Sequence, residues 1–137
     1  MDYIRSKVNL AEESIAFLHP KGGGFFDEIR RRLLKDGYAH VDIKQRADWP
    51  EGIINIGLST MHSAKGLEFD HVIAIGLSQN MMEQDLDEDD ERMQTWRKLL
   101  AMAIGRAKYS VVLGYKPTEG SRLVRYLDPA TYETVVV

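Results

Sequence analysis

The chain has 137 residues, enough for one domain with a buried core, and its net charge of −3 gives it no overall attraction to nucleic acid. It has no cysteine, which excludes disulfides, zinc–thiolate sites and cysteine nucleophiles. No apolar run approaches the ~18 residues of a membrane span and no secretory leader is present, so we expect a cytoplasmic protein that does not enter a membrane. We expect a single domain over residues 1–137, in which residues 1–13 form a flexible N-terminal segment.

Short apolar runs alternate along the chain with stretches of helical periodicity. Residues 25–35 repeat apolar side chains at helical spacing, and Gly37 follows them where a helix commonly ends in a left-handed residue. A second helix is expected after residue 91, and its apolar stripe comprises Met93, Trp96, Leu100, Ala103, Ile104 and Ala107. The expected strands are 14–19, 40–44, 53–59, 72–77, 109–115 and 131–137, and a further helix is expected at 120–127.

An acidic run precedes the second helix. Seven of the nine residues at positions 83–91 are Asp or Glu. Negative charge is favourable near a helix N-terminus, so this run is expected to be a solvated loop or the beginning of that helix.

Uniformly apolar strands that alternate with helices indicate an α/β fold, in which a mainly parallel sheet is flanked by helices. Ligands of such sheets usually bind beyond the carboxyl ends of the strands. The polar turn at residues 59–68 follows the expected strand 53–59, and we therefore expect the functional site at this end of the sheet.

This turn concentrates several polar groups. Ser59, Thr60 and His62 can donate to phosphate oxygens, although Ser or Thr at a strand end can equally cap the turn itself. Lys65 holds the turn or faces phosphate, and it is not a Walker lysine because no G-x-x-x-x-G-K-[ST] motif surrounds it. Considered on its own, Glu68 is expected to be a solvated surface carboxylate.

Two further residues suggest phosphate chemistry. Arg106 lies at the edge of the apolar stripe near the helix end, where a guanidinium needs an ionic partner or an opening to a cleft. Its planar fork suits the spread charge of a phosphate. Lys21 precedes three glycines between a strand and a helix, but no hydroxyl residue follows these glycines, so a phosphate loop here is the weaker interpretation.

Two segments together resemble a known family. Residues 56–73 contain Ser-Thr-Met-His-Ser-Ala-Lys-Gly-Leu-Glu-Phe, which resembles motif V of the UvrD/Rep-type superfamily 1 DNA helicases. Residues 99–108 resemble the arginine-bearing motif VI of the same helicases, and the two motifs occur in the family's order and spacing. The resemblance implies the second, C-terminal RecA-like (P-loop NTPase-type) motor domain of an ATP-dependent DNA helicase, without the accessory insertion usually found before motif V.

The resemblance also implies roles for the motif V residues in nucleic-acid binding. Thr60 and His62 would contact the backbone of single-stranded DNA, with Ser59 and Lys65 beside them. The family match favours this role over the capping role for Thr60 and His62.

For the nucleotide, the resemblance implies that Glu68 reaches the ribose or phosphate region of ATP. Arg106 would be the catalytic residue, an arginine finger on the γ-phosphate. Lys21 is the nearest match in position to the ATP-binding arginine of motif IV. Arg97 and Lys98 match the basic pair that precedes motif VI.

The chain departs from the family in ways that define the alternatives. It contains no Walker A or Walker B motif, so ATP and Mg²⁺ would be shared with a separate N-terminal RecA-like domain that bears both, and the isolated chain is not expected to hydrolyse ATP. Gly105 and Ala101 stand where the family usually has threonine and an aromatic residue. These two residues and the acidic run favour the main alternative, a non-catalytic interaction or regulatory module on a degenerate helicase fold. A small nucleotide-binding protein that works alone is the third and weakest interpretation.

Overall fold

The computed structural model describes residues 2–21, 24–44, 49, 54–77, 91–115 and 127–135. In chain order the elements are α1 (Asp2–Lys7), β1 (Ile15–His19), α2 (Phe25–Lys35), β2 (Val41–Ile43), β3 (Ile56–Thr60), β4 (Phe69–Ala74), α4 (Glu91–Ile104), β5 (Ala107–Leu113) and the 3₁₀ helix η3 (Pro129–Thr131). Over these described ranges, no helix combines the length and apolar character needed to cross a bilayer.

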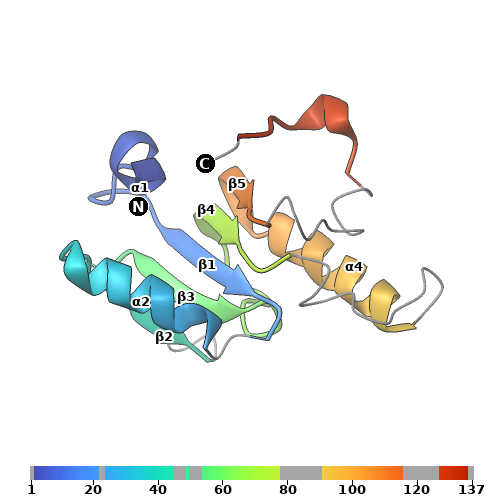
Figure 1. Ribbon diagram of the computed structural model, residues 1–137, viewed down its shortest axis with the longest axis horizontal. Helices are drawn as coiled ribbons and strands as arrows, with labels where there is room; N and C mark the ends of the chain where they lie inside the picture. The colour runs from blue at the N-terminus through green and yellow to red at the C-terminus, as the bar shows by residue number, and fades with distance from the viewer. Residues whose placement is uncertain are drawn as a thin grey trace.

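The five strands form one sheet in the order β2-β3-β1-β4-β5, and every neighbouring pair is parallel. β1 is therefore the central strand, between β3 and β4 (Figure 1). Residues of α2 pack on one face of the sheet and residues of α4 on the other. The predicted α/β fold with a parallel sheet flanked by helices is confirmed.

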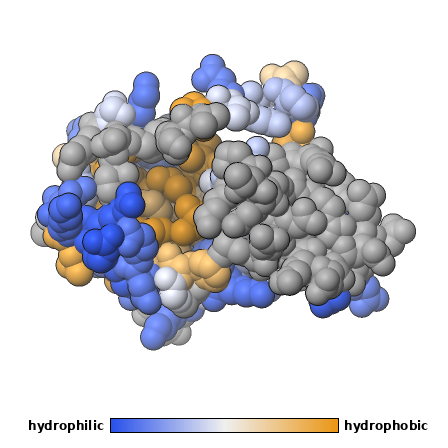
Figure 2. Space-filling model, in the orientation of Figure 1, coloured by the Kyte–Doolittle hydropathy of each residue, from blue (hydrophilic) through white to orange (hydrophobic). Residues whose placement is uncertain are grey.

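Each face of the sheet has its own apolar core. The α2 side buries Ile4, Ile15, Phe17, Phe26, Leu33, Ile56, Leu58 and Ile73. The α4 side buries a larger set that includes the β1 residues Ala16 and Leu18 and the helix residues Met93, Leu99, Leu100 and Ala103. Ile4 belongs to α1 and is 1% exposed, so the N-terminal helix is anchored in the first of these cores. Figure 2 shows an apolar area, in orange, beside hydrophilic side chains, in blue.

Helix α2 matches its predicted bounds. Its buried side chains are Phe26 and Leu33, seven residues apart on one stripe. After the helix, Gly37 has a φ of 76°, and the amides of Gly37 and Tyr38 donate to the carbonyls of Leu34 and Leu33 at 3.2 and 2.8 Å. This is a Schellman ending, which satisfies carbonyls that the last helical turn leaves unpaired, and it confirms the left-handed glycine expected from the sequence.

Strands β4 and β5 begin earlier than the sequence indicated. The prediction began β4 at Val72 because Asp70 and His71 interrupt the apolar run, but the strand begins at Phe69. Phe69 is fully buried and packs edge-on against Trp49, with ring centroids 5.2 Å apart. Asp70 and His71, the polar residues that follow Phe69, are tolerated in this strand because each has a hydrogen-bond partner. In the same way Ala107 begins β5 instead of extending the apolar stripe of α4.

The prediction for the C-terminus was wrong where the structure describes it. Residues 131–137 were expected to form a strand, but Thr131 ends η3 and the backbone from Tyr132 to Val135 is irregular and exposed. β-branched residues favour a strand only when a neighbouring strand and a packed face are available, and this segment pairs with neither of the outer strands, β2 and β5. The expected helix at 120–127, apart from Leu127, and the acidic run at 83–90 lie outside the described residues.

Candidate functional site

The connection between β3 and β4, residues 61–68, is built on a repeat of three. Tight turns close with bonds from Lys65 N to the His62 carbonyl at 3.2 Å and from Leu67 N to the Ala64 carbonyl at 3.0 Å. Such i→i+3 bonding places side chains three apart in one row. The inner row is Met61, Ala64 and Leu67, all buried in the core on the α4 side, and the outer row is His62, Lys65 and Glu68, all exposed. The core therefore fixes which side chains face solvent.

This connection runs across the sheet from one edge to the other. Thr60 is at the carboxyl end of β3 and Phe69 is at the amino end of β4. Because β3 and β4 are both parallel to β1 and flank it, residues 61–68 must pass over β1. The sequence placed the whole polar turn at the carboxyl ends of the strands. That placement is correct for Thr60 but wrong for Glu68, which lies at the amino edge.

At the carboxyl edge, the hydroxyls of Thr60 and Ser59 have structural bonds. Thr60 Oγ1 accepts from the Ser63 amide at 3.1 Å and donates to Ser63 Oγ at 3.0 Å. Ser59 is 2% exposed, and its hydroxyl donates to the Thr60 carbonyl at 2.9 Å. Both residues hold the first turn of the connection in place, which matches the capping interpretation that the sequence left open.

At the amino edge, the structure brings Glu68 and Arg106 together. The Phe69 amide, next to Glu68, donates to the Arg106 carbonyl at 2.8 Å, and Phe69 is the register partner of Ala107. Arg106 is half-buried, and its Nε–H has no acceptor among the residues that the structure describes. A buried donor without a partner is costly, which makes this guanidinium a candidate to bind a group other than the described residues.

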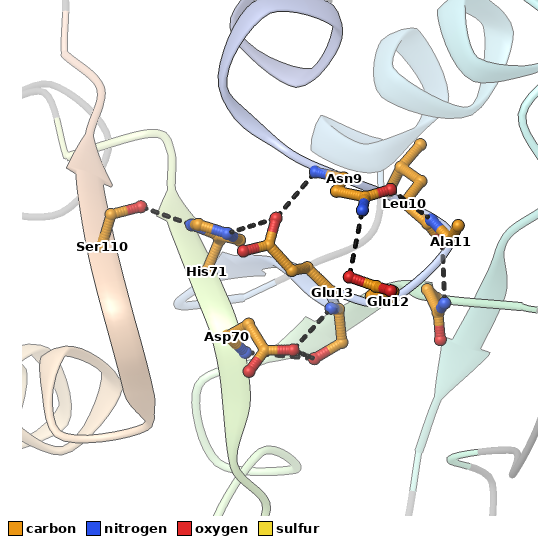
Figure 3. A network of polar contacts seen from close by, with 10 residues as sticks. Asn9, Leu10, Ala11, Glu12, Glu13, Asp70, His71 and Ser110 are labelled. Carbon is orange, nitrogen blue, oxygen red and sulfur yellow. Dashed lines mark hydrogen bonds and ion pairs between the residues drawn. The ribbon is translucent and has the colours of Figure 1, made fainter.

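A polar network secures the same edge (Figure 3). One oxygen of Asp70 accepts from the backbone amide and the hydroxyl of Ser14, at 2.8 and 3.2 Å, and the Asp70 amide donates to the same hydroxyl at 3.0 Å. Two residues that are 56 positions apart in sequence are thereby joined. These three bonds fix the start of β4, and with it the backbone between Glu68 and Arg106.

His71 extends this network through the sheet. It is 5% exposed, its Nδ1 lies 2.7 Å from Ser110 Oγ in β5, and its Nε2 lies 3.5 Å from a carboxylate oxygen of Glu13. Glu13 in turn accepts from the Asn9 amide at 2.7 Å. The loop before β1 is thus connected to both β4 and β5. These residues could not be predicted from the sequence, because partners this far apart in the chain leave no local pattern.

Lys21 lies at the opposite edge from the two residues with which the sequence analysis grouped it. It follows the carboxyl end of β1 and is exposed, whereas Glu68 and Arg106 lie at the amino edge. Its amide donates to His19 Nδ1 at 3.0 Å. The nucleotide candidates Glu68 and Lys21 are therefore not one cluster.

His19 is a buried imidazole that the sequence analysis did not single out. It is 1% exposed and stacks on Phe25, with ring centroids 4.0 Å apart and planes 22° apart. Burial, and then the nearby Lys21 ammonium, lowers the pKa of His19 from 6.5 to about 4. The imidazole is therefore neutral at physiological pH.

This depressed pKa predicts a specific loss of stability in acid. Because the pKa is lower in the folded than in the unfolded chain, the contribution of His19 is fully present above pH 6.5 and is lost as the pH falls towards 4. Between about pH 7 and pH 4.5 we expect it to remove roughly 2 kcal/mol of the free energy of unfolding. Urea titrations of the parent and of His19→Asn, whose amide oxygen replaces the Nδ1 acceptor, measure this difference. Equal pH dependence in the two proteins would contradict it.

A groove with a volume of about 480 Å³ is lined by residues of α4 and by Leu127. Leu100, Ala101 and Ile104 contribute apolar side chains to it. Arg97 and Lys98, the basic pair singled out from the sequence, also line it. The groove therefore combines an apolar floor with positive charge.

Comparison with known proteins places these motifs in a family context. The profile of the UvrD-like helicase C-terminal domain matches residues 34–117. The chain is 35% identical over 101 residues to the ATP-dependent DNA helicase PcrA of Leuconostoc citreum, a match that covers 64% of this chain and 13% of that protein. It is 34% identical over 64 residues to DNA helicase II of Escherichia coli K12, which covers 46% of this chain and 9% of that protein. The chain thus spans about a tenth of the length of these curated relatives.

A solved structure has a similar fold. The C-terminal domain of a possible DNA helicase from Lactobacillus plantarum WCFS1 superposes with a TM-score of 0.63 and 23% identity, over 88% of this chain and 66% of that one. At this identity the likeness concerns the fold alone.

Proposed function

Because this chain belongs to the UvrD-like helicase C-terminal domain family, we propose that it works as the second motor domain of an ATP-dependent DNA helicase. One observation carries the proposal. The connection 61–68 is a single segment anchored in the core, and it presents His62 at the carboxyl edge and Glu68 at the amino edge. A movement imposed at one end of such a segment is transmitted to the other.

The amino edge is the proposed nucleotide side. Arg106 offers a guanidinium whose buried Nε–H lacks an acceptor among the described residues, and Glu68 offers an exposed carboxylate next to the same backbone hydrogen bond. A cation suits the phosphates of ATP and a carboxylate suits ribose hydroxyls, so these groups fit that nucleotide. ATP supplies the phosphoryl-transfer energy, and the ligands of Mg²⁺ would come from the first RecA-like domain. With ATP bound between the two domains, Arg106 would stabilise the charge that spreads over the transferred phosphate.

The carboxyl edge is the proposed DNA side. His62 lies at this edge and Lys65 is the next residue of the exposed row, and both can donate to phosphate oxygens without any net positive charge on the domain. Thr60, through its bonds to Ser63, holds the turn that presents them, and Ser59 supports it from inside. DNA contact in this proposal therefore belongs chiefly to His62 and Lys65.

The DNA side predicts specific changes in binding. His62→Ala and Lys65→Ala should each weaken binding of a labelled single-stranded oligonucleotide about fivefold, since each removes one hydrogen bond worth about 1 kcal/mol. Lys65→Ala should also reduce the log–log salt slope by about 0.7, the value for one neutralised phosphate on a single strand. Fluorescence anisotropy at several salt concentrations measures both effects.

Thr60 provides the matched controls for this experiment. Thr60→Ser keeps the hydroxyl and should bind as the parent does, whereas Thr60→Ala should lose about 1 kcal/mol of stability together with affinity. If His62→Ala and Lys65→Ala bind normally while their melting curves match the parent, the DNA role of this edge is refuted.

The second candidate function is the non-catalytic interaction module. The groove along α4 favours it, because an apolar floor beside Arg97 and Lys98 suits a protein segment with acidic and apolar side chains. Ala101, which lines this groove, and Gly105 are also the two positions that depart from the family's motif VI. The ATPase kcat of an Arg106→Ala variant separates the two candidates, because only the motor domain requires this arginine for turnover.

A further inference from the structure

Phe25 is an exposed aromatic residue with one face covered. It is the first residue of α2 and is 40% exposed, although its ring stacks on His19 at a centroid distance of 4.0 Å. Since His19 covers one face of the ring, the exposed surface belongs to the opposite face and the edges. A flat aromatic face supported from behind and open in front is a surface on which another planar ring can stack.

The residues behind Phe25 hold it firmly. His19 also meets Phe26 edge-on, with ring centroids 6.2 Å apart, and accepts from the Lys21 amide at 3.0 Å. On another side the backbone of Gly76 lies so close that a Cβ built there would be 2.4 Å from His19 Nε2. With little freedom left to His19, the Phe25 ring has a fixed support.

This aromatic face lies at the same edge of the sheet as the proposed DNA contacts. His19 is the register partner of Thr60, and the Met61 amide donates to the His19 carbonyl at 3.1 Å. Lys21 is exposed, and its ammonium is near enough to His19, the ring on which Phe25 stacks, to lower the pKa of that imidazole. An aromatic face and a cation beside a polar turn are the combination that single-stranded nucleic acid requires, a platform for a base and donors for its phosphates.

We propose that Phe25 is a stacking platform for one base of the single-stranded DNA, with Lys21 contacting a phosphate beside that base. The inference rests on the proposed DNA function of the carboxyl edge. It adds a contact with a base, whereas His62 and Lys65 contact the backbone alone. Because every base has a flat face, the platform should show little preference for sequence.

The test uses an oligonucleotide that carries 2-aminopurine, whose fluorescence is quenched when it stacks. Phe25→Leu, which keeps apolar packing on His19 but removes the aromatic face, should weaken binding roughly 5-fold to 100-fold and abolish the quenching. Phe25→Trp should retain both affinity and quenching. Lys21→Gln should weaken binding and lower the salt slope by about 0.7 without affecting the quenching.

Two controls keep the test decisive. Leu34→Ala removes another exposed apolar side chain of α2, 71% exposed, and should change neither affinity nor quenching. An abasic site in the oligonucleotide tests the parent protein without any mutation, since loss of the stacked base should weaken the parent as much as Phe25→Leu does and weaken the Leu variant no further.

The outcomes distinguish this inference from the function on which it rests. If His62→Ala and Lys65→Ala weaken binding but Phe25→Leu and the abasic site do not, the stacking platform is refuted and the DNA edge stands. If none of these changes alters binding, or the parent does not bind single-stranded DNA, both are refuted.

Discussion

In the two-domain helicase proposed above, Arg106→Ala should lower the ATPase kcat by about 10³-fold and change ATP affinity far less. Arginines that meet a transferred phosphate contribute 10³–10⁵-fold in nucleotide hydrolases, because the contact strengthens as charge develops in the transition state. The donor for this contact would be the buried Nε–H of Arg106, which has no acceptor among the described residues. Steady-state ATPase assays, with nucleotide affinity measured separately, give the two quantities.

Two further substitutions make this experiment specific. Arg106→Lys keeps the charge but loses the planar fork, and should remain strongly impaired. Arg31→Ala removes an exposed arginine whose carboxylate partner is Glu28 on the same helix, a pair of little energetic value, and should leave kcat unchanged. A near-native kcat for Arg106→Ala would make this arginine structural and favour the interaction module.

The sequence was sufficient to predict the family and the type of fold. The motif V and motif VI residues predicted the UvrD-like helicase domain that the family profile confirms, and the alternation of apolar runs predicted the parallel sheet. Both predicted bounds of the helix at residues 25–35 were correct, because this helix has a clear apolar stripe and a glycine just after its end. Local signals of this kind need no knowledge of the tertiary structure.

The arrangement of the candidate site could not be predicted in the same way. The sequence places Glu68 only eight residues after Thr60, and the structure puts the two at opposite edges of the sheet. It likewise grouped Lys21 with Glu68 and Arg106, although Lys21 follows the carboxyl end of β1. Both errors arise because strand order is not local information: only with β1 between β3 and β4 does the connection have to cross the sheet.

The support behind Phe25 was missed for a related reason. In the sequence His19 is the end of an apolar run and Phe25 is one apolar residue of a helical stripe. Their stacking depends on where α2 begins relative to β1, and on Gly76, which is 57 positions after His19. Gly76 leaves space for the imidazole because it has no side chain. A single glycine in the sequence does not indicate which distant side chain occupies that space.

The close approach of Gly76 to His19 therefore predicts that Gly76→Ala lowers the free energy of unfolding by about 3 kcal/mol. The substitution combines two costs. At a φ of 71° an L side chain is strained, and the new Cβ would meet His19 Nε2 at 2.4 Å and Cδ2 at 2.6 Å. Thermal melting should show a fall in Tm of roughly 10 °C for a chain of this size.

Gly37→Ala separates the two costs, because Gly37 has a similar φ of 76° but no atom within 4 Å of the new Cβ. It should lose only about 1 kcal/mol, the cost of backbone strain. In a double-mutant cycle, His19→Ala should relieve part of the damage caused by Gly76→Ala, since the clash needs both side chains. If Gly76→Ala and Gly37→Ala are equally destabilising, or His19→Ala and Gly76→Ala are simply additive, the imidazole is not held against Gly76. Phe25 would then lack the fixed support that its proposed stacking role requires.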